Sequence, residues 1–314
     1  NYWATSPYLP AADMPFSGET APYSHSIEDS ITALIPLPDD LLGFGCESSL
    51  YRLTGHPLQN GQIDLVTTET GVAYGTPFAK DPAGTVYFYG SKGGVWAWNL
   101  AGPPVNLVAH RIERDLQDLD RSLFRVEMRW SYRDEGLYVF VIGRVDGQVH
   151  SSWFWDAKND GWWEDPYAQP VTAVCTFDGD DPNDRVVLMG SEDGHVRAIS
   201  AGASSDDGVR IDSSTLLGPF TGGYLRALLS RIEIVLDHDQ GGCTFEVFTG
   251  ENPRQFGEAK LEGEFLPGWN PPRLFRQAGN YFWLRLRNAT LSRWAMESLA
   301  LFVSPLGAKR SVEA

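Results

Sequence analysis

Two stretches of the chain, Val86-Tyr-Phe-Tyr-Gly90-Ser-Lys-Gly-Gly-Val95-Trp96 and Val187-Leu-Met-Gly190-Ser-Glu-Asp-Gly194-His-Val196, repeat one pattern of apolar strand, glycine turn and second strand. Two further copies begin at Leu42 and Val139, and the marker glycines of the four copies fall at 45, 90, 143 and 190. The intervals of 45, 53 and 47 residues match the roughly 40 to 50 residues of a four-stranded propeller blade. The repeat therefore predicts an all-β fold that begins with a β-propeller.

The third copy continues through Trp153-Phe-Trp-Asp156 and a polar turn to Gly161-Trp162-Trp163, which predicts the outer hairpin of a blade. Residues 112–123 carry apolar side chains at helical spacing and are the best candidate for a short helix between blades. Four units are few for a closed propeller. Either residues before Asn1 supply more blades, or residues 1–35 and segments after Ile199 complete the ring.

The pattern changes after Ile199, where residues 200–214 are rich in Gly, Ser and Asp. We expect propeller blades in residues 1–205 and a small β-sandwich or jelly-roll-like domain in residues 206–314. Alternating apolar residues predict strands at 231–236, 281–287 and 296–303, with residues 244–248 as the hairpin partner of the first.

The chain has 314 residues and a formal net charge of −16, from 41 acidic and 25 basic side chains. Such a field repels nucleic-acid phosphates and anionic membranes, so we expect neither as a specific partner. Cys46, Cys175 and Cys243 are odd in number and far apart, which predicts free thiols in a reducing compartment. No segment has the length and apolarity of a membrane span, and no signal-peptide pattern opens the chain.

Motifs that carry chemistry are incomplete or missing. The acidic run Asp178-Gly-Asp180-Asp181-Pro-Asn-Asp184 could hold calcium, but it lacks the full EF-hand spacing, and we favour a solvated turn. Residues 91–96 and 191–194 each match only part of the Asp-box hairpin of sialidase propellers. The six histidines have no ligand spacing, and no nucleophile elbow or phosphate loop occurs. These absences predict a protein without catalytic residues, metal or cofactor.

Trp153, Trp155, Trp162 and Trp163 form the densest aromatic group and are the candidate interaction surface. Flat apolar rings match the hydrophobic faces of pyranose sugars, so an exposed set could bind a glycan. Packing between blades explains the same residues, and we favour it.

A family resemblance adds to these patterns. The stretches Ile35-Pro-Leu-Pro-Asp-Asp40, Cys46-Glu-Ser-Ser-Leu-Tyr-Arg52, Gly61-Gln-Ile-Asp-Leu-Val66 and Thr70-Gly-Val-Ala-Tyr-Gly75, continuing from Lys80 to Val95, resemble the propeller repeats of tailed-bacteriophage virion proteins of the neck, tail or nozzle. Residues 281–287, 294–299 and 307–310 resemble the C-terminal β-module that often accompanies them. The resemblance implies a ring-forming structural component that contacts copies of itself and other virion proteins.

Our leading hypothesis from sequence is thus a non-enzymatic virion structural component of a tailed phage, assembled in the host cytoplasm and located in the virion. A carbohydrate-binding or receptor-recognising propeller is the first alternative. A propeller enzyme is the second, with a glycosidase as its main form.

Overall fold

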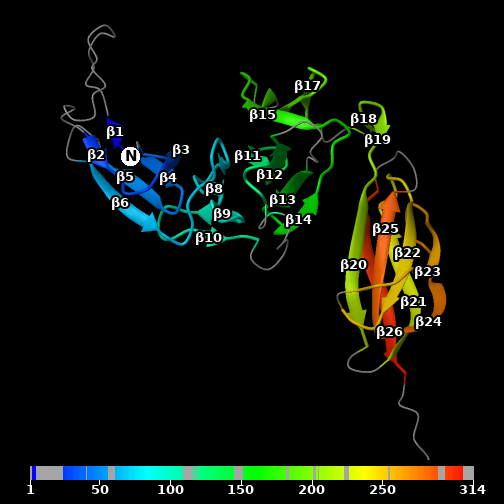
Figure 1. Cartoon of the computed structure of the whole chain (residues 1–314). Coiled ribbons are helices and arrows are strands. Elements are labelled where there is room, and N and C mark those ends of the chain that lie inside the picture. Colours follow the sequence, from blue (N-terminus) through cyan, green and yellow to red (C-terminus); the bar gives the residue numbers. More distant parts are fainter. Residues whose placement is uncertain are drawn as a thin grey trace, which may run out of the picture. The chain divides into compact units, whose positions relative to one another are not determined.

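Antiparallel β-sheets account for the regular structure of the chain, for which we use a computed structural model (Figure 1). It describes residues 2–4, 24–39, 41–55, 61–108, 116, 119–144, 151–181, 184–200, 203, 205–222, 226–253, 255–288 and 294–306. Contacts divide the chain into two units, residues 1–200 and 201–314. The boundary predicted from sequence, between residues 205 and 206, lies a few residues beyond this division.

Unit 1 contains four successive sheets, which are the blades of a β-propeller. Blade 1 comprises β3 (Ile31–Pro36), β4 (Leu42–Cys46), β5 (Leu50–Thr54) and β6 (Gln62–Thr67). Blade 2 comprises β7 (Phe78–Lys80), β8 (Val86–Tyr89), β9 (Val95–Trp98) and β10 (Val105–Asn106). Blade 3 comprises β11 (Phe124–Ser131), β12 (Gly136–Gly143), β13 (Ser151–Asp156) and β14 (Gly161–Glu164). Blade 4 comprises β15 (Val171–Phe177), β16 (Val186–Ser191) and β17 (Val196–Ala198), and a two-stranded sheet of β1 (Tyr2–Ala4) and β2 (Ser24–Ser26) precedes the blades.

The predicted repeat is confirmed, since the strands of each blade follow one another in sequence and in space. The four marker glycines lie in, or directly after, the second strand of their blades. The outer hairpin predicted around Trp153 and Trp162 is the β13–β14 pair.

Neighbouring blades pack face to face through apolar side chains. Because side chains of a strand alternate between its two faces, a sheet that is covered on both sides is apolar at nearly every position. Strand β12 shows this directly, with seven of its eight residues buried. One apolar cluster, which includes Ile35 and Trp98, fills the space between blades 1 and 2. A second, with Tyr89 and Val139, lies between blades 2 and 3. A third, with Phe140, lies between blades 3 and 4.

Glycine at position 45 lets the next segment of chain approach blade 1. A Cβ atom at Gly45 would lie 2.6 Å from the Cβ atom of Val72, which is fully buried. Glycine alone leaves that space empty. The same repeat position in blade 4 is different, because the nearest atoms to a Cβ at Gly190 would be 3.8 Å away.

Two arginines of β11 join blade 3 to blade 4. Arg125 donates to the carbonyl oxygen of Thr172, and Arg129 Nη2 donates to that of Val174 at 2.7 Å. Glu127 lies between the two arginines, 3.6 Å from a nitrogen of each. Burial lowers the pKa of Arg129, and the carboxylate of Glu127 opposes that effect.

Unit 2 is a β-sandwich. One sheet has the order β20 (Ser214–Thr221), β25 (Tyr281–Asn288), β22 (Cys243–Gly250) and β23 (Ala259–Phe265). The other has the order β24 (Arg273–Gly279), β21 (Ala227–Leu236) and β26 (Met296–Pro305), and the short pair β18 (Ser205–Asp206) and β19 (Val209–Arg210) precedes them. Inward residues of both sheets, such as Ile234, Phe245 and Leu284, form one buried core.

The predicted strands at 231–236, 281–287 and 296–303 lie within β21, β25 and β26. The predicted hairpin between 231–236 and 244–248 is wrong, because β21 pairs with β24 and β26 whereas β22 pairs with β23 and β25. Both strands direct their apolar residues into the same core from opposite sheets, so the turn between them crosses from one sheet to the other.

No α-helix is assigned among the described residues, and none of them forms a helical segment that could cross a membrane. Half of the helix predicted for residues 112–123, namely 112–115 and 117–118, lies outside the described residues. Its described end, residues 119–123, leads through a turn into β11.

We predict that Gly45→Ala destabilises unit 1 by about 1–3 kcal/mol, because the new methyl group overlaps Val72 in a close-packed contact. Gly102→Ala is the matched control, since a Cβ there meets no atom within 4 Å. Urea unfolding followed by tryptophan fluorescence measures both variants. Equal stability of the two would contradict the packing described here.

Candidate functional site

One hollow of unit 1 lies where loops of blades 1 to 3 meet, and we call it the inner pocket. It has a volume of about 470 Å³, within the usual range for small-molecule sites. Strand β11 contacts both β7 and β15, so the first strands of successive blades lie side by side around the propeller axis. The inner pocket is located at the start of β11, and is lined by Glu47, Ala73, Tyr74, Tyr89, Leu119, Asp120, Arg121, Ser122, Phe124, Arg125, Val126 and Arg144.

Local turns position the polar side chains of the inner pocket. Glu47 occupies the tight connection between β4 and β5, and its backbone N–H donates to Ser30 at 2.9 Å. Tyr74 is exposed in the loop that precedes β7. Asp120 begins the turn before β11, where its carbonyl oxygen accepts hydrogen bonds from the N–H groups of Leu123 and Phe124, both at 3.0 Å.

The inner pocket contains both engaged and free polar groups. Arg125 is held by Glu127 and Thr172, and Arg144 Nε donates to the carbonyl oxygen of Phe124 at 3.1 Å. Within the part of the chain that the structure describes, the side chains of Glu47, Tyr74 and Arg121 have no polar partner. They are available to donate to, or accept hydrogen bonds from, a bound molecule.

Asp120 is kept ionised. The hydroxyl group of Ser122 donates to its Oδ1 at 2.6 Å and the Ser122 N–H donates to the same atom at 2.9 Å. Both bonds favour the charged form, so they lower the pKa of the carboxyl group. Tyr89 closes the wall of the pocket, and its hydroxyl group donates to the carbonyl oxygen of Leu116 at 2.5 Å.

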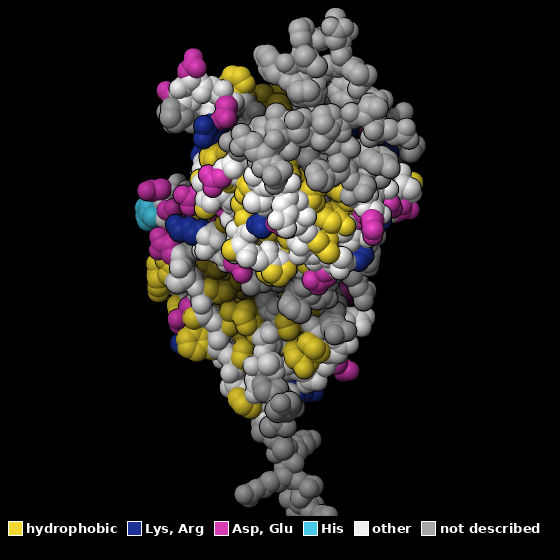
Figure 2. All heavy atoms as spheres, turned by 90° about the vertical axis from the view of Figure 1, so that its left-hand side faces the viewer, with side chains coloured by type: hydrophobic (Ala, Val, Ile, Leu, Met, Phe, Trp, Pro, Cys, Tyr) yellow, Lys and Arg dark blue, Asp and Glu magenta, His cyan; other side chains and the backbone are white. Residues whose placement is uncertain are grey.

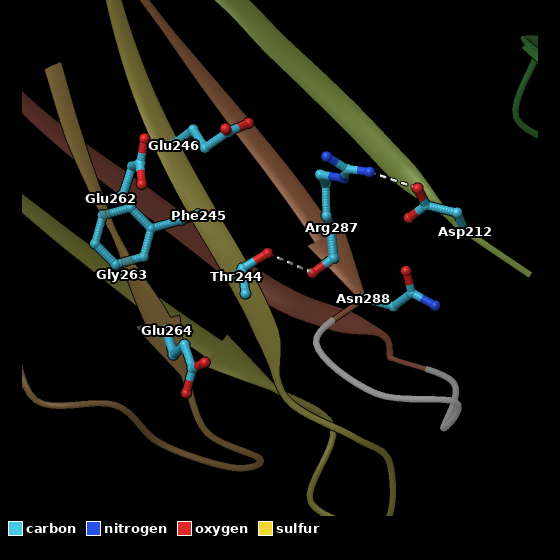
Figure 3. Close-up of a pocket in the computed structure, with 9 residues that line it drawn as sticks. All are labelled: Asp212, Thr244, Phe245, Glu246, Glu262, Gly263, Glu264, Arg287 and Asn288. Atoms are coloured by element: carbon cyan, nitrogen blue, oxygen red, sulfur yellow. Dashed lines mark hydrogen bonds and ion pairs between the residues drawn. The ribbon is translucent and has the colours of Figure 1, made fainter. Parts of the chain in front are cut away.

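Unit 2 has a second hollow, which we call the sandwich groove (Figure 3). It runs over β22, β23 and β25, has a volume of about 790 Å³, and is lined by Asp212, Thr244, Phe245, Glu246, Glu262, Gly263, Glu264, Arg287 and Asn288. Arg287 pairs with Asp212, and Arg285 pairs with Glu246 at 3.1 Å. Glu262 and Glu264, the other charged residues of the groove, have no ion-pair partner in the part of the chain that is described. Both are negative, so the described groove lacks the mixed free groups of the inner pocket.

The four tryptophans predicted as an interaction surface do not share one face. Trp155 is stacked on Trp162 at 6.1 Å between centroids, and both lie with Trp153 in the cluster between blades 2 and 3. Trp163 pairs with Phe154 on the opposite face of blade 3 and is 46% exposed, whereas Trp155 is 7% exposed. This placement agrees with packing between blades and gives no continuous platform for a sugar.

No group of three or more His, Cys, Asp or Glu side chains in the described ranges is arranged to hold a metal ion. In the acidic run 178–184, Asp178 pairs with Arg185, and Asp184 N–H donates to the carbonyl oxygen of Asp181 at 2.9 Å. Cys46 and Cys243 are buried, which raises the pKa of each thiol to about 11, and Cys175 is exposed; all three are free.

Sequence reasoning missed the residues of the inner pocket. Glu47, Tyr74 and Asp120 come from three different inter-strand segments and share no motif. The available signal was positional, since each lies just before or after a strand at the same end of successive blades.

Comparisons with known proteins give no family. No protein-family model and no curated protein matches the chain. Among solved structures, it is similar to an exo-beta-1,3-galactanase from Phanerochaete chrysosporium, at 10% sequence identity and a TM-score of 0.27, over 86% of this chain and 80% of that chain. It is also similar to a glycoside hydrolase at 11% identity and a TM-score of 0.28, over 86% and 83%. Likeness at this level assigns no residue, substrate or reaction to the chain.

These comparisons correct the leading hypothesis from sequence. The solved structures named here are glycoside hydrolases rather than virion proteins, in contrast to the predicted non-enzymatic neck or tail component of a phage. The same comparisons run counter to the prediction that the chain is not an enzyme. The succession of antiparallel sheets in unit 1 confirms the β-propeller as the fold.

We predict that Ser122→Ala raises the pKa of Asp120, because the variant loses the hydroxyl donor that favours the ionised carboxylate. Carboxyl NMR titration measures the change. Asp29, whose carboxylate accepts hydrogen bonds from Ser48 and Ser49, is the internal control and should titrate as in the original protein. An unchanged pKa of Asp120 would exclude this assignment of its hydrogen bonds.

Proposed function

We propose that the chain is a propeller glycoside hydrolase that binds a sugar in the inner pocket. The observation that carries the proposal is the presence of two carboxylates, Glu47 and Asp120, from different blades in one pocket that also has a free guanidinium and a free phenol. Glycoside hydrolysis generally uses two carboxyl groups on either side of the scissile bond.

The two carboxylates suit different roles. Asp120 is held ionised by Ser122, so it acts as the nucleophile or as the base that activates water. Glu47, whose side chain accepts no hydrogen bond within the described residues, acts as the acid that protonates the leaving oxygen. The proton of the acid passes to the glycosidic oxygen as the bond to the anomeric carbon breaks.

The free groups of the pocket orient the sugar. The exposed ring of Tyr74 offers a flat apolar surface for one face of a pyranose. Arg121 donates to ring hydroxyl groups or to a carboxylate of the substrate, because its guanidinium has several donors in a fixed plane. The pocket contains Arg121, Arg125 and Arg144 against two carboxylates, so it tolerates a neutral or acidic sugar in a chain whose net charge is −16.

We expect the purified chain to release sugar from at least one member of a panel of aryl glycosides and polysaccharides. Glu47→Gln and Asp120→Asn should each lower the rate by about 100-fold or more, as is usual when a general acid or base is removed. Arg121→Ala should raise KM more than it lowers kcat, because Arg121 binds the substrate in the ground state as well as in the transition state.

Glu69→Gln is the matched control, since Glu69 is an exposed carboxylate of unit 1 outside the inner pocket. Its rate should equal that of the original protein. The proposal is overturned if the panel yields no more sugar than a boiled sample, or if Glu47→Gln and Asp120→Asn retain full activity. Glycan binding without turnover would favour the carbohydrate-binding alternative.

A further inference from the structure

The two hollows of the protein differ in the sign of the charge that lines them. Among the residues that the structure describes, the inner pocket is lined by Arg121, Arg125 and Arg144 against Glu47 and Asp120. The described lining of the sandwich groove has a single arginine against Asp212, Glu246, Glu262 and Glu264. The chain as a whole has 25 basic and 41 acidic side chains, so the excess of arginine in the inner pocket is opposite to its overall composition. An anion therefore suits the inner pocket better than the sandwich groove.

Arg121 is the guanidinium of the pocket that is open to a ligand. It is exposed in the turn before β11, and its side chain has no polar partner in the described part of the chain. The neighbouring carboxylate, Asp120, is engaged elsewhere, because its Oδ1 accepts hydrogen bonds from both the hydroxyl group and the N–H of Ser122. The N–H donors of Arg121 are thus available to a bound molecule.

Arg125 and Arg144 are fixed by backbone groups, which keep both arginines at the pocket wall. Arg125 donates to the carbonyl oxygen of Thr172, and Arg144 Nε donates to that of Phe124 at 3.1 Å. A carbonyl oxygen has no net charge, so neither hydrogen bond cancels the charge of the arginine. Glu127 lies 3.6 Å from Arg125, but it lies equally close to the other arginine of β11. The described part of the pocket wall therefore keeps a net positive charge.

The kind of cation in the pocket indicates the kind of anion. No lysine is among the described residues that line the inner pocket. A guanidinium presents parallel N–H donors in one plane, which match the two oxygens of a carboxylate, whereas a lysine ammonium is a point charge. A hexuronic acid has such a carboxylate at C6, in place of the hydroxymethyl group of a neutral hexose. The two sugars are otherwise alike in shape.

We infer that the sugar bound in the inner pocket is a hexuronic acid whose carboxylate is held by Arg121. The assignment rests on the proposed function, because it places the glycosidic bond between Glu47 and Asp120. In a hexuronic acid, C5 carries the carboxylate and is joined to the anomeric carbon through the ring oxygen. Arg121 and Asp120 are adjacent in the chain, so they reach these two neighbouring parts of one ring. Tyr74, which is 55% exposed, covers a face of that ring.

The charge of the sugar makes Arg121 more important for a uronate than for a neutral hexose. A uronate brings a third carboxylate to a pocket that already contains Glu47 and Asp120, and like charges repel. Arg121 offsets this repulsion and donates hydrogen bonds to the carboxylate. A neutral hexose meets no such repulsion. Loss of Arg121 should therefore weaken the binding of a uronate far more than that of its neutral counterpart.

Free monosaccharides test the assignment separately from hydrolysis, because they have no glycosidic bond. Titrations followed by ligand-observed NMR should give glucuronate or galacturonate an affinity about tenfold or more above that of glucose or galactose. Arg121→Gln should remove this preference and leave the binding of the neutral sugar unchanged. Arg276→Gln is the matched control, since Arg276 is an exposed arginine of unit 2 that lines neither hollow. It should retain the preference for the uronate.

Equal affinity for a uronate and its neutral counterpart would overturn this inference and leave the proposed glycoside hydrolase intact. Uronate binding that survives Arg121→Gln would have the same meaning. Tighter binding of a uronate, without release of sugar from any glycoside of the panel, would support this inference and overturn the proposed function. Glucose 6-sulfate that binds as tightly as glucuronate would refute the assignment of a carboxylate. Absence of binding by all of these sugars would overturn the inference outright.

Discussion

Face-to-face packing of apolar sheets is the interaction on which unit 1 depends. A sheet that is covered on both sides has no water to receive polar side chains, so its strands must be apolar on both faces, as β8 and β12 are. Where the covering ends, buried positions give way to exposed ones. In β15, Val174 is buried against blade 3, and the following residues of the strand are exposed.

The repeat could be predicted from sequence because each blade packs against its neighbours in the same way and therefore has the same order of apolar residues and glycine. Glycines at 45, 90, 143 and 190 recur since the second strand of each blade ends in the same way. The pairing of the unit 2 strands could not be predicted so simply. Alternation in β21 and β22 shows only which residues face a core, and it is identical whether the partner strand follows in sequence or lies in the opposite sheet.

The inner pocket was beyond prediction for a related reason. Its lining extends in sequence from Glu47 to Arg144. These residues come together only because successive sheets pack at a particular angle, and no local sequence pattern encodes that angle. The tryptophans show the opposite error. A dense run of rings draws attention in sequence, but strand alternation separates Trp163 from Trp155 and Trp162 by the thickness of a sheet.

The hollows of the two units differ in whether their charged side chains are already paired with other groups of the protein. In the sandwich groove, Arg285 and Arg287 are paired with Glu246 and Asp212, so the positive groups are committed to the protein itself. In the inner pocket, Arg121 has no polar partner among the described residues and lies beside a carboxylate that Ser122 holds ionised. Free groups of both signs around one space are what a ligand with many hydroxyl groups requires.

Arg125 and Arg129 hold blade 4 through carbonyl oxygens of Thr172 and Val174 rather than through side chains. Every residue type has a backbone carbonyl, so these hydrogen bonds do not require particular side chains at positions 172 and 174. The outward positions of β15 can therefore change in evolution while the strand stays aligned with blade 3. The pair of arginines on β11 thus holds blade 4 in place and leaves its outward side chains free to change.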